Sequence, residues 1–144
     1  MTSATAKVLV VANRTAGSEE LLEALRERAQ AGPAHFHLVV PATPHGVSWA
    51  ADMHAGTAAA EHDLEGALAR LREQEIDCDG EVGDPDPIAA VHDSAHFGAY
   101  DEVIVSTLPK HLSRWLRLDL PRRVAHATGL PTKHVVAHHA SVPA

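Results

Sequence analysis

The chain has 144 residues, a formal net charge of -7 and a single cysteine. This length suits one domain, which we take to span residues 1–144, with a core that needs no disulfide to stabilise it. The negative charge provides no basic field that would attract nucleic acid or an anionic membrane. A single cysteine excludes an intramolecular disulfide, and the N-terminal residues contain no apolar run long enough for secretion or a membrane span, so a cytoplasmic location is expected.

Apolar runs and amphipathic segments alternate along the first half of the chain. The run KVLVVAN, residues 7–13, is rich in β-branched side chains and predicts a strand that is buried on both faces. Ser18 is a suitable N-cap for a helix that follows it. A second strand is expected to end at Pro41, followed by a long irregular connection over 41–56 and a helix over 57–75.

The second half repeats the alternation. Acidic residues alternate with apolar or small ones in IDCDGEVGD, residues 76–84, which predicts an edge strand whose acids are exposed to solvent. Asp84 and Pro85 predict the N-cap and the first residue of a third helix. The run DEVIVST predicts a fourth strand. Asp119 predicts the cap of a fourth helix, which ends at Gly129, and the run KHVVAHH predicts a closing strand.

Four strand–helix pairs and a closing strand, without a hairpin signal between them, predict an α/β fold. We expect a flavodoxin-like or Rossmann-like doubly wound sheet of about five parallel strands with helices on both faces. Ligands of such sheets lie beyond the carboxyl ends of the strands, near the point where the strand order reverses. The loops that follow Asn13, Val40 and Ser106 are therefore expected to line a crevice.

Three segments carry a resemblance to a known family. VLVVANRTAGSEELLEAL is similar to the opening strand, loop and helix of the universal stress protein family, GDPDPIAAVHDSAHFGAYDEVIVST to its GDP segment and fourth strand, and GLPTKHVV to its final proline and strand. The resemblance covers nearly the entire chain. It implies a five-stranded flavodoxin-like α/β domain that commonly forms dimers, and a role in the stress response.

The segment STLPKHLSRWLRLD, residues 106–119, departs from the family pattern. Members that bind ATP have two glycines close together after the fourth strand, and then Gly-Ser or Gly-Thr, whereas this segment has no glycine. Glycine lets successive backbone N–H groups approach a phosphate, but Pro109 has no N–H, and Leu108 and Leu112 add bulk. The usual backbone cradle for ATP is therefore not expected.

Polar and cationic side chains at the same edge predict a site with altered contacts. Many family members have an aspartate in the first loop, where this chain has Asn13 followed by Arg14, an exchange that favours an anion over a divalent metal. Val40 would offer backbone polarity to a base, and Lys110 and Arg114 would hold the negative charge near the N-terminus of the last helix. The predicted ligand-binding residues are Asn13, Arg14, Thr15, Val40, Ser106, Thr107, Lys110, Arg114 and Asp119.

Other candidate residues are interpreted as structural. His35 and His37 share one face of a strand, but no third zinc ligand accompanies them, and the acids of the predicted edge strand lack the glycine and the final glutamate of a calcium loop. Cys78 is predicted to be a buried, inert thiol. Ser106 has no adjacent histidine and aspartate. No catalytic residue or metal site is predicted, and we do not expect an enzyme.

Two functions remain open. The first is a small binding protein, similar to universal stress proteins, that holds ATP, another adenine nucleotide or another anionic ligand at the crevice. The second is a ligand-free dimeric interaction or scaffold protein in which Leu108, Pro109 and Trp115 fill the crevice and the last strand pairs with its mate. A homodimer is expected in both cases, with no nucleic-acid or membrane partner.

Overall fold

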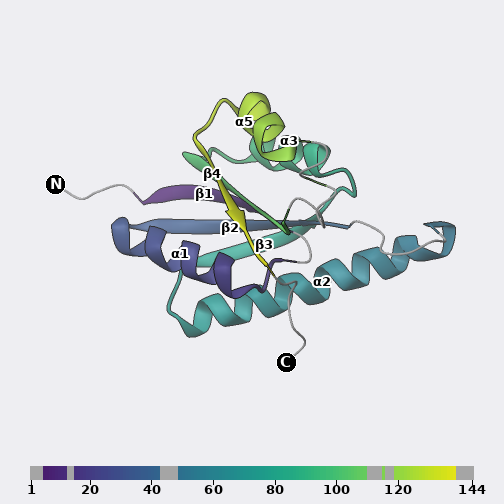
Figure 1. Ribbon diagram of the computed structural model, residues 1–144, viewed down its shortest axis with the longest axis horizontal. Helices are drawn as coiled ribbons and strands as arrows, with labels where there is room; N and C mark the ends of the chain where they lie inside the picture. Colours follow the sequence, from purple (N-terminus) through teal and green to yellow (C-terminus); the bar gives the residue numbers. More distant parts are fainter. Residues whose placement is uncertain (1–4, 13–14, 43–48, 110–114, 116–118, 139–144) are drawn as a thin grey trace.

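The computed structural model describes residues 5–12, 15–42, 49–109, 115 and 119–138, with the backbone alone for 49–56 and 97. These residues form one five-stranded sheet covered by helices on both faces (Figure 1). The strand order is β3-β2-β1-β4-β5, and each neighbouring pair is parallel. The predicted doubly wound α/β sheet is thus confirmed.

Strands and helices alternate in the predicted order. The strands are β1 (Ala6–Val11), β2 (Ala34–Pro41), β3 (Cys78–Gly83), β4 (Glu102–Thr107) and β5 (Thr132–Val136). The helices are α1 (Glu19–Ala31), α2 (Trp49–Glu73), α3 (Pro87–Phe97) and α5 (Leu120–Thr128). The chain runs outward from β1 to β3 and then returns to β4 on the other side of β1, so the strand order reverses between β1 and β4.

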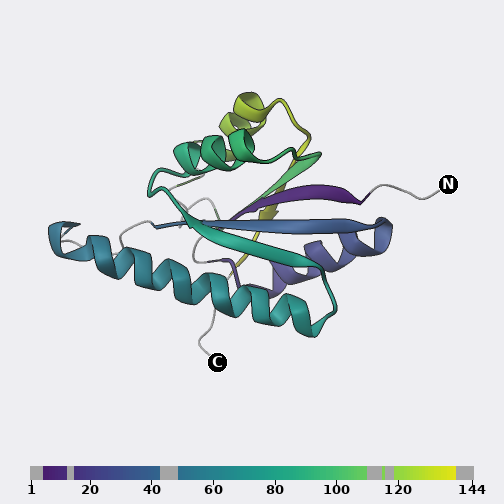
Figure 2. The same ribbon diagram turned by 180° about the vertical axis from the view of Figure 1, so that it is seen from behind.

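Alternating side chains of the strands build a hydrophobic core on each face of the sheet, because successive residues of a strand point to opposite faces. The core on the face of α1 and α2 includes Val8, Val10, Leu25, Phe36, Leu38 and Leu64. The core on the face of α3 and α5 includes Leu9, Val11, Val91, Val103, Val105 and Val124. Figure 2 shows the two helix pairs on opposite sides of the sheet. The first predicted strand is therefore buried on both faces, as expected.

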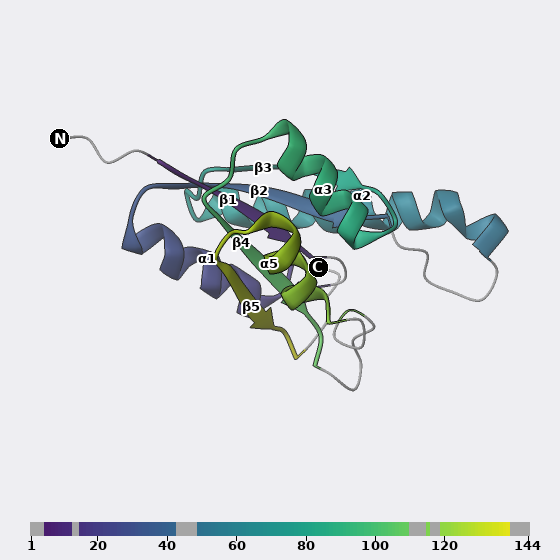
Figure 3. The same ribbon diagram turned by 90° about the horizontal axis from the view of Figure 1, so that it is seen from above.

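Helix α2 begins earlier than the sequence indicated. The irregular connection predicted over 41–56 is wrong for its second part, because the helix begins at Trp49. The residues WAADMHAG contain no proline and several good helix formers, so they can extend a helix that packs further along the chain. Figure 3 shows this part of α2 extending past the sheet. The helix ends at Glu73, close to the expected end, and Glu75 has a positive φ of 59°.

Helix α3 begins at the second of two Asp-Pro pairs. Its N-cap is Asp86 and its first residue is Pro87, so the prediction of Asp84 and Pro85 is wrong by one pair. The Asp86 carboxylate accepts a hydrogen bond of 2.9 Å from the N–H of Ile88. Asp84 instead accepts one of 2.9 Å from the N–H of Asp86, which forms the turn before the helix. Both pairs match a helix start locally, and the structure uses the second.

The remaining predicted helix ends lie where expected. Ser18 caps α1 by accepting a backbone hydrogen bond from its first turn, and Gly32 follows its last residue. Gly129, with φ of 68°, ends α5. Asp119 occupies the N-cap position of α5 as predicted, but its side chain makes no capping hydrogen bond, and its carboxylate lies 4.0 Å from Arg122. None of the helices in the described residues has the length and apolar character needed to cross a membrane.

Candidate ligand site at the switch point

The strand order reverses at the carboxyl ends of β1 and β4, which lie side by side with Val11 opposite Val105. Thr15, in the segment that follows β1, and Ser106, near the end of β4, are both fully buried. Their hydroxyl oxygens lie 2.7 Å apart and share a hydrogen bond. The sequence predicted both residues for the site, and the fold brings them into direct contact.

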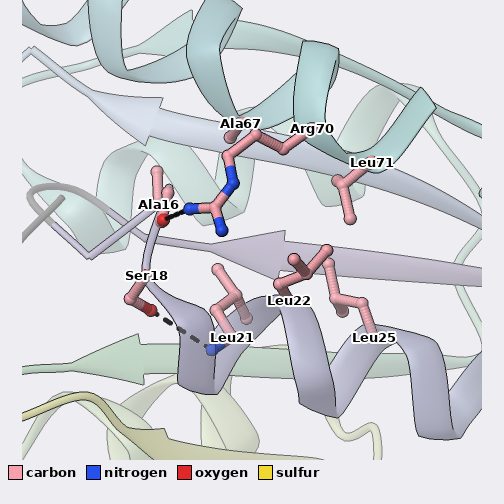
Figure 4. Close-up of a pocket in the computed structure, with 9 residues that line it drawn as sticks. Ala16, Ser18, Leu21, Leu22, Leu25, Ala67, Arg70 and Leu71 are labelled. Carbon is pink, nitrogen blue, oxygen red and sulfur yellow. Dashed lines mark hydrogen bonds between the residues drawn. The ribbon is translucent and has the colours of Figure 1, made fainter. Parts of the chain in front are cut away.

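The segment that carries Thr15 is held by further hydrogen bonds. The N–H of Ser18 donates to the carbonyl of Thr15 over 3.0 Å. From α2, the guanidinium of Arg70 donates to the carbonyl of Gly17 (Figure 4). It also donates to the carboxylate of Glu19. The sequence analysis did not single out Arg70, because no local pattern shows that α2 lies beside the start of α1. The wall of the site next to β1 is therefore fixed from two directions.

The cavity beneath this segment is too small for a ligand. Apolar side chains of α1 and α2, among them Leu21, Leu25 and Leu71, line it together with Arg70 (Figure 4). Its volume is about 10 Å³, which is room for about one water molecule. The cavity is a packing gap between two helices and does not compete with the edge of the sheet as a site.

Thr107, the last residue of β4, faces β5. Its hydroxyl donates to the carbonyl of Leu108 over 2.9 Å, and Nε2 of His134 lies 2.7 Å from the same oxygen. Because the hydroxyl has a single proton, the histidine must donate through Nε2–H. Burial lowers the pKa of His134, which favours this neutral ring. A ligand that binds the Thr107 hydroxyl would therefore have to join an existing pair of hydrogen bonds.

Of the other predicted site residues, the structure describes Val40 and Asp119 but not the remaining four. Val40 is buried near the end of β2, where it pairs with Val82 of β3, and Asp119 is exposed at the start of α5. Asn13, Arg14, Lys110 and Arg114 lie outside the described residues. The described part of the candidate site thus consists mainly of buried hydroxyl groups at the carboxyl ends of β1 and β4.

Trp115, which lies between β4 and α5 in the chain, is part of the hydrophobic core. Its side chain is 4% exposed and packs with Leu120 and Val124 in the core on the face of α3 and α5. Leu116 and Leu118 lie outside the described residues. Arg122 and Arg123 are exposed on α5.

A second polar cluster lies on β2 and β3. The sequence analysis did not predict that its residues lie together. His35 and His37 hydrogen-bond the acids of β3, which were predicted only to be exposed to solvent. The alternation of the two histidines and of the acids was visible, but the pairing of the two strands was needed to join them. No group of histidine, cysteine, aspartate and glutamate side chains in the described ranges can hold a metal ion.

Cys78, also on β3, is buried and unoxidised as predicted. The residue is 8% exposed and lies against α2, with Sγ 4.0 Å from the carbonyl of Leu68. Burial raises the pKa of the Cys78 thiol, which keeps it in the unreactive protonated form. The structure therefore supports the interpretation of this cysteine as a core residue.

Comparison with known proteins relates the fold to solved structures. Scans of protein-family models and of curated proteins gave no match. A universal stress protein family protein from Arabidopsis thaliana with AMP bound has a TM-score of 0.64 at 14% identity, covering 96% of both chains. A universal stress protein from Archaeoglobus fulgidus has a TM-score of 0.62 at 15% identity, covering 90% of this chain and 93% of that one. A universal stress protein in complex with cAMP has a TM-score of 0.62 at 21% identity, covering 93% and 98%. The chain thus has the fold that its resemblance implied.

Proposed function

We propose that this chain is a universal stress protein-like binding protein that holds an adenine nucleotide, or another anionic ligand, at the carboxyl ends of β1 and β4. The observation that supports the proposal most directly is the buried hydroxyl pair of Thr15 and Ser106 at the point where the strand order reverses. Two solved structures with the same fold are described as holding AMP and cAMP. In this proposal the chain binds its ligand and does not turn it over.

Side chains, rather than a glycine-rich backbone, hold the phosphate in this proposal. Pro109 has no N–H, so the segment after β4 lacks one of the donors of a backbone cradle. Lys110 and Arg114 supply the positive charge on one side, and Asn13 and Arg14 supply an amide and a guanidinium on the other. Charged donors of this kind suit a phosphate better than a ribose diol.

Thermal unfolding in the presence of AMP, cAMP, ATP and inorganic phosphate tests the proposal. A ligand that binds only the native state raises the melting temperature by mass action, so at least one nucleotide at about 100 times its Kd would stabilise the protein by about 2.7 kcal/mol. The Lys110→Ala/Arg114→Ala variant is expected to lose this shift. The charge-matched control Arg122→Ala/Arg123→Ala removes two exposed cations of α5 and should keep it.

Two outcomes contradict the proposal in different ways. If no ligand shifts the melting temperature at millimolar concentration, the crevice does not bind these anions. If the shift is the same in the Lys110→Ala/Arg114→Ala variant as in the wild type, a nucleotide binds but these side chains do not hold it. Isothermal titration calorimetry on the same variants provides an independent measure of affinity.

A dimeric interaction protein without a nucleotide is the second candidate, and two observations favour it. Trp115 is buried in the core on the face of α3 and α5, which suits a side chain that packs against the protein and does not contact a ligand. Within the described residues, β5 pairs only with β4, so it forms one edge of the sheet, and Val136 on it is 37% exposed. We propose that β5 pairs with β5 of a second copy in a homodimer.

The backbone of β5 allows a specific test of the dimer. Ala137 donates its N–H to Thr107 on β4, so the N–H of Val136, which points the opposite way in an extended strand, is directed to the free edge. Val136→Pro removes this outward donor without removing a β4 hydrogen bond, and Val136→Thr is the matched control. Analytical ultracentrifugation should show dissociation for the proline variant only. A wild-type monomer, or a proline variant that remains dimeric, contradicts this arrangement.

A further inference from the structure

Five side chains on β2 and β3 form a continuous line of hydrogen bonds. Nδ1 of His35 lies 2.8 Å from a carboxylate oxygen of Asp77, and Nε2 of the same ring lies 3.0 Å from Oδ1 of Asp79. Nδ1 of His37 lies 2.8 Å from that same Asp79 oxygen, and its Nε2 lies 3.3 Å from Oε1 of Glu81. We call these five residues the histidine–carboxylate ladder.

The pairing of two parallel strands produces the ladder. His37 lies opposite Asp79 in the β2–β3 register, and residues two apart on a strand point to the same face. The histidines of β2 and the acids of β3 therefore meet in alternation. Because Val39 packs in the core on the face of α3 and α5, the ladder lies on that face, toward the amino-terminal ends of the strands.

The chemistry of the contacts selects a protonation state. An ionised carboxylate only accepts hydrogen bonds, whereas a neutral imidazole has one N–H donor and one acceptor nitrogen. Each ladder ring faces carboxylate oxygens with both nitrogens, so a neutral ring would place a lone pair against one of them. Both contacts of a ring are satisfied only when both of its nitrogens carry protons. The geometry thus describes imidazolium rings between carboxylates.

Groups on the neighbouring elements add to the electrostatics of the ladder. From α3, Asp93 lines the same surface hollow as His37, and Ser94 donates to Glu81 over 3.0 Å. From the segment before β4, the ring of Tyr100 stacks on His37 with centroids 6.1 Å apart. The negative charge of Asp93 and the aromatic ring of Tyr100 both favour a positively charged neighbour in this hollow.

The strand on the other side of β2 adds one opposing charge. Lys7 of β1 lies opposite His35 in the β1–β2 register, and two positive charges side by side repel. Asp101 lies close to this residue and accepts a hydrogen bond of 2.8 Å from its backbone N–H. The carboxylates of β3 lie within hydrogen-bond distance of the ring, and so they outweigh this more distant cation.

The titration of the ladder follows from the same contacts. The hydrogen bond to Asp77 raises the pKa of His35 above its ordinary value of 6.5. Burial opposes ionisation of Asp79, but the hydrogen bonds from His37 and His35 outweigh it and hold the pKa of Asp79 below its ordinary 3.8. A histidine whose pKa is raised by folding stabilises the native state below pH 6.5, and this contribution is lost as the pH rises through the folded value.

We propose that protonation of the histidine–carboxylate ladder stabilises the pairing of the edge strand β3 with β2. This pairing becomes more stable as the pH falls through the neutral range. In the described part of the chain, β2 is the only strand that pairs with β3. The side-chain hydrogen bonds therefore supplement the backbone hydrogen bonds of a strand that has no second neighbour. The charge change falls in the range where histidines act as switches. The proposal does not depend on a nucleotide.

Urea unfolding at about pH 6 and about pH 8 measures the effect, since these values bracket the histidine range. Between these pH values, the folding equilibrium constant of the wild type is expected to change by a factor of about ten for each unit by which folding raises the pKa of His35. His35→Gln/His37→Gln keeps neutral hydrogen-bonding side chains and should lose this part of the pH dependence. His62→Gln, at an exposed position of α2, is the control and should retain it. The same pH dependence in the double variant and the wild type would overturn the proposal.

Nitrogen-15 NMR of the ring nitrogens gives a readout that does not depend on unfolding. At about pH 6 both nitrogens of His35 should carry protons, where a free histidine is partly neutral. Asp79→Asn removes the acceptor that the two rings share and should move the titration midpoint of His35 downward. A neutral His35 ring at this pH, or a His35 midpoint that is the same in the Asp79→Asn variant, would overturn the proposal.

Discussion

The hydroxyls of Thr15 and Ser106 share a hydrogen bond of 2.7 Å, although 91 positions of sequence separate the two residues. Thr15 belongs to the segment that leads out of β1, and Ser106 lies near the end of β4. Both side chains are fully buried. This contact is therefore a buried polar pair at the place in the sheet where the strand order reverses. A buried hydroxyl that loses its partner is costly, which makes the pair a sensitive probe of the candidate site.

Substitutions at this pair are expected to be non-additive. Ser106→Ala leaves the Thr15 hydroxyl buried without this partner and should lower the free energy of unfolding by about 1–3 kcal/mol. Thr15→Val alone should have a cost of similar size, and the double variant should cost less than the sum of the two. Urea unfolding of the four proteins in a double-mutant cycle measures the coupling. Strict additivity would show that the hydroxyls do not interact in solution.

Two glycines should respond to alanine in opposite directions. At Gly80 in β3 an added Cβ would lie 2.6 Å from a methyl of Leu64 and 2.7 Å from the backbone carbonyl of Leu38. The carbonyl belongs to the adjacent strand, so Gly80→Ala should destabilise the protein by about 1–3 kcal/mol. At Gly66 in α2 nothing lies within 4 Å of the added atom, and alanine should stabilise the helix by about 0.5–1 kcal/mol. Thermal unfolding compares the variants, and equal melting temperatures would contradict the close contact at β3.

Cys78 should resist thiol reagents in the native protein. Its side chain is buried, and burial raises the pKa of its thiol, so both access and the thiolate form are limited. We expect its reaction with a disulfide reagent at about pH 8 to be slower in native buffer than in denaturing urea by about a hundredfold or more. Absorbance of the released thiol measures the rate. Equal rates in the two conditions would place the thiol at the surface.

His134 should titrate in the opposite sense to His35. Burial lowers the pKa of His134 below 6.5, so the unfolded chain takes up this proton more readily than the native one, and the stability contribution of this residue falls as the pH drops below 6.5. His134→Gln retains a donor for the Thr107 hydroxyl and should remove this loss at acidic pH. NMR titration of the ring provides the direct measurement. A midpoint of 6.5 or higher would contradict this downward shift of the His134 pKa.

Local patterns were sufficient for most of the secondary structure. The apolar run of β1 and the caps at Ser18 and Gly129 act over a few residues, and the structure agrees with all three. The start of α3 was mistaken because two Asp-Pro pairs match the same signal, and the structure uses the one at Asp86. The early start of α2 at Trp49 was missed because glycine and proline nearby indicated a loop.

The sites depended more on tertiary structure. Thr15 and Ser106 were predicted because each follows an apolar strand and because the chain resembles a family that places ligands there. Their contact requires β1 and β4 to be neighbours, which no local pattern shows. For the ladder, the sequence indicated that His35 and His37 share a face, but their partners lie 42 and 44 positions away in the chain.

The sequence by itself determined which segments form strands and helices and which face of each is apolar, because periodicity reports the local backbone and the side-chain direction. Only the tertiary structure decided which strands are neighbours and in what register, since that choice depends on burying both faces of the whole sheet at once. The hydroxyl pair at the switch point and the histidine–carboxylate ladder are consequences of that register. The first depends on the pairing of β1 with β4, and the second on the pairing of β2 with β3.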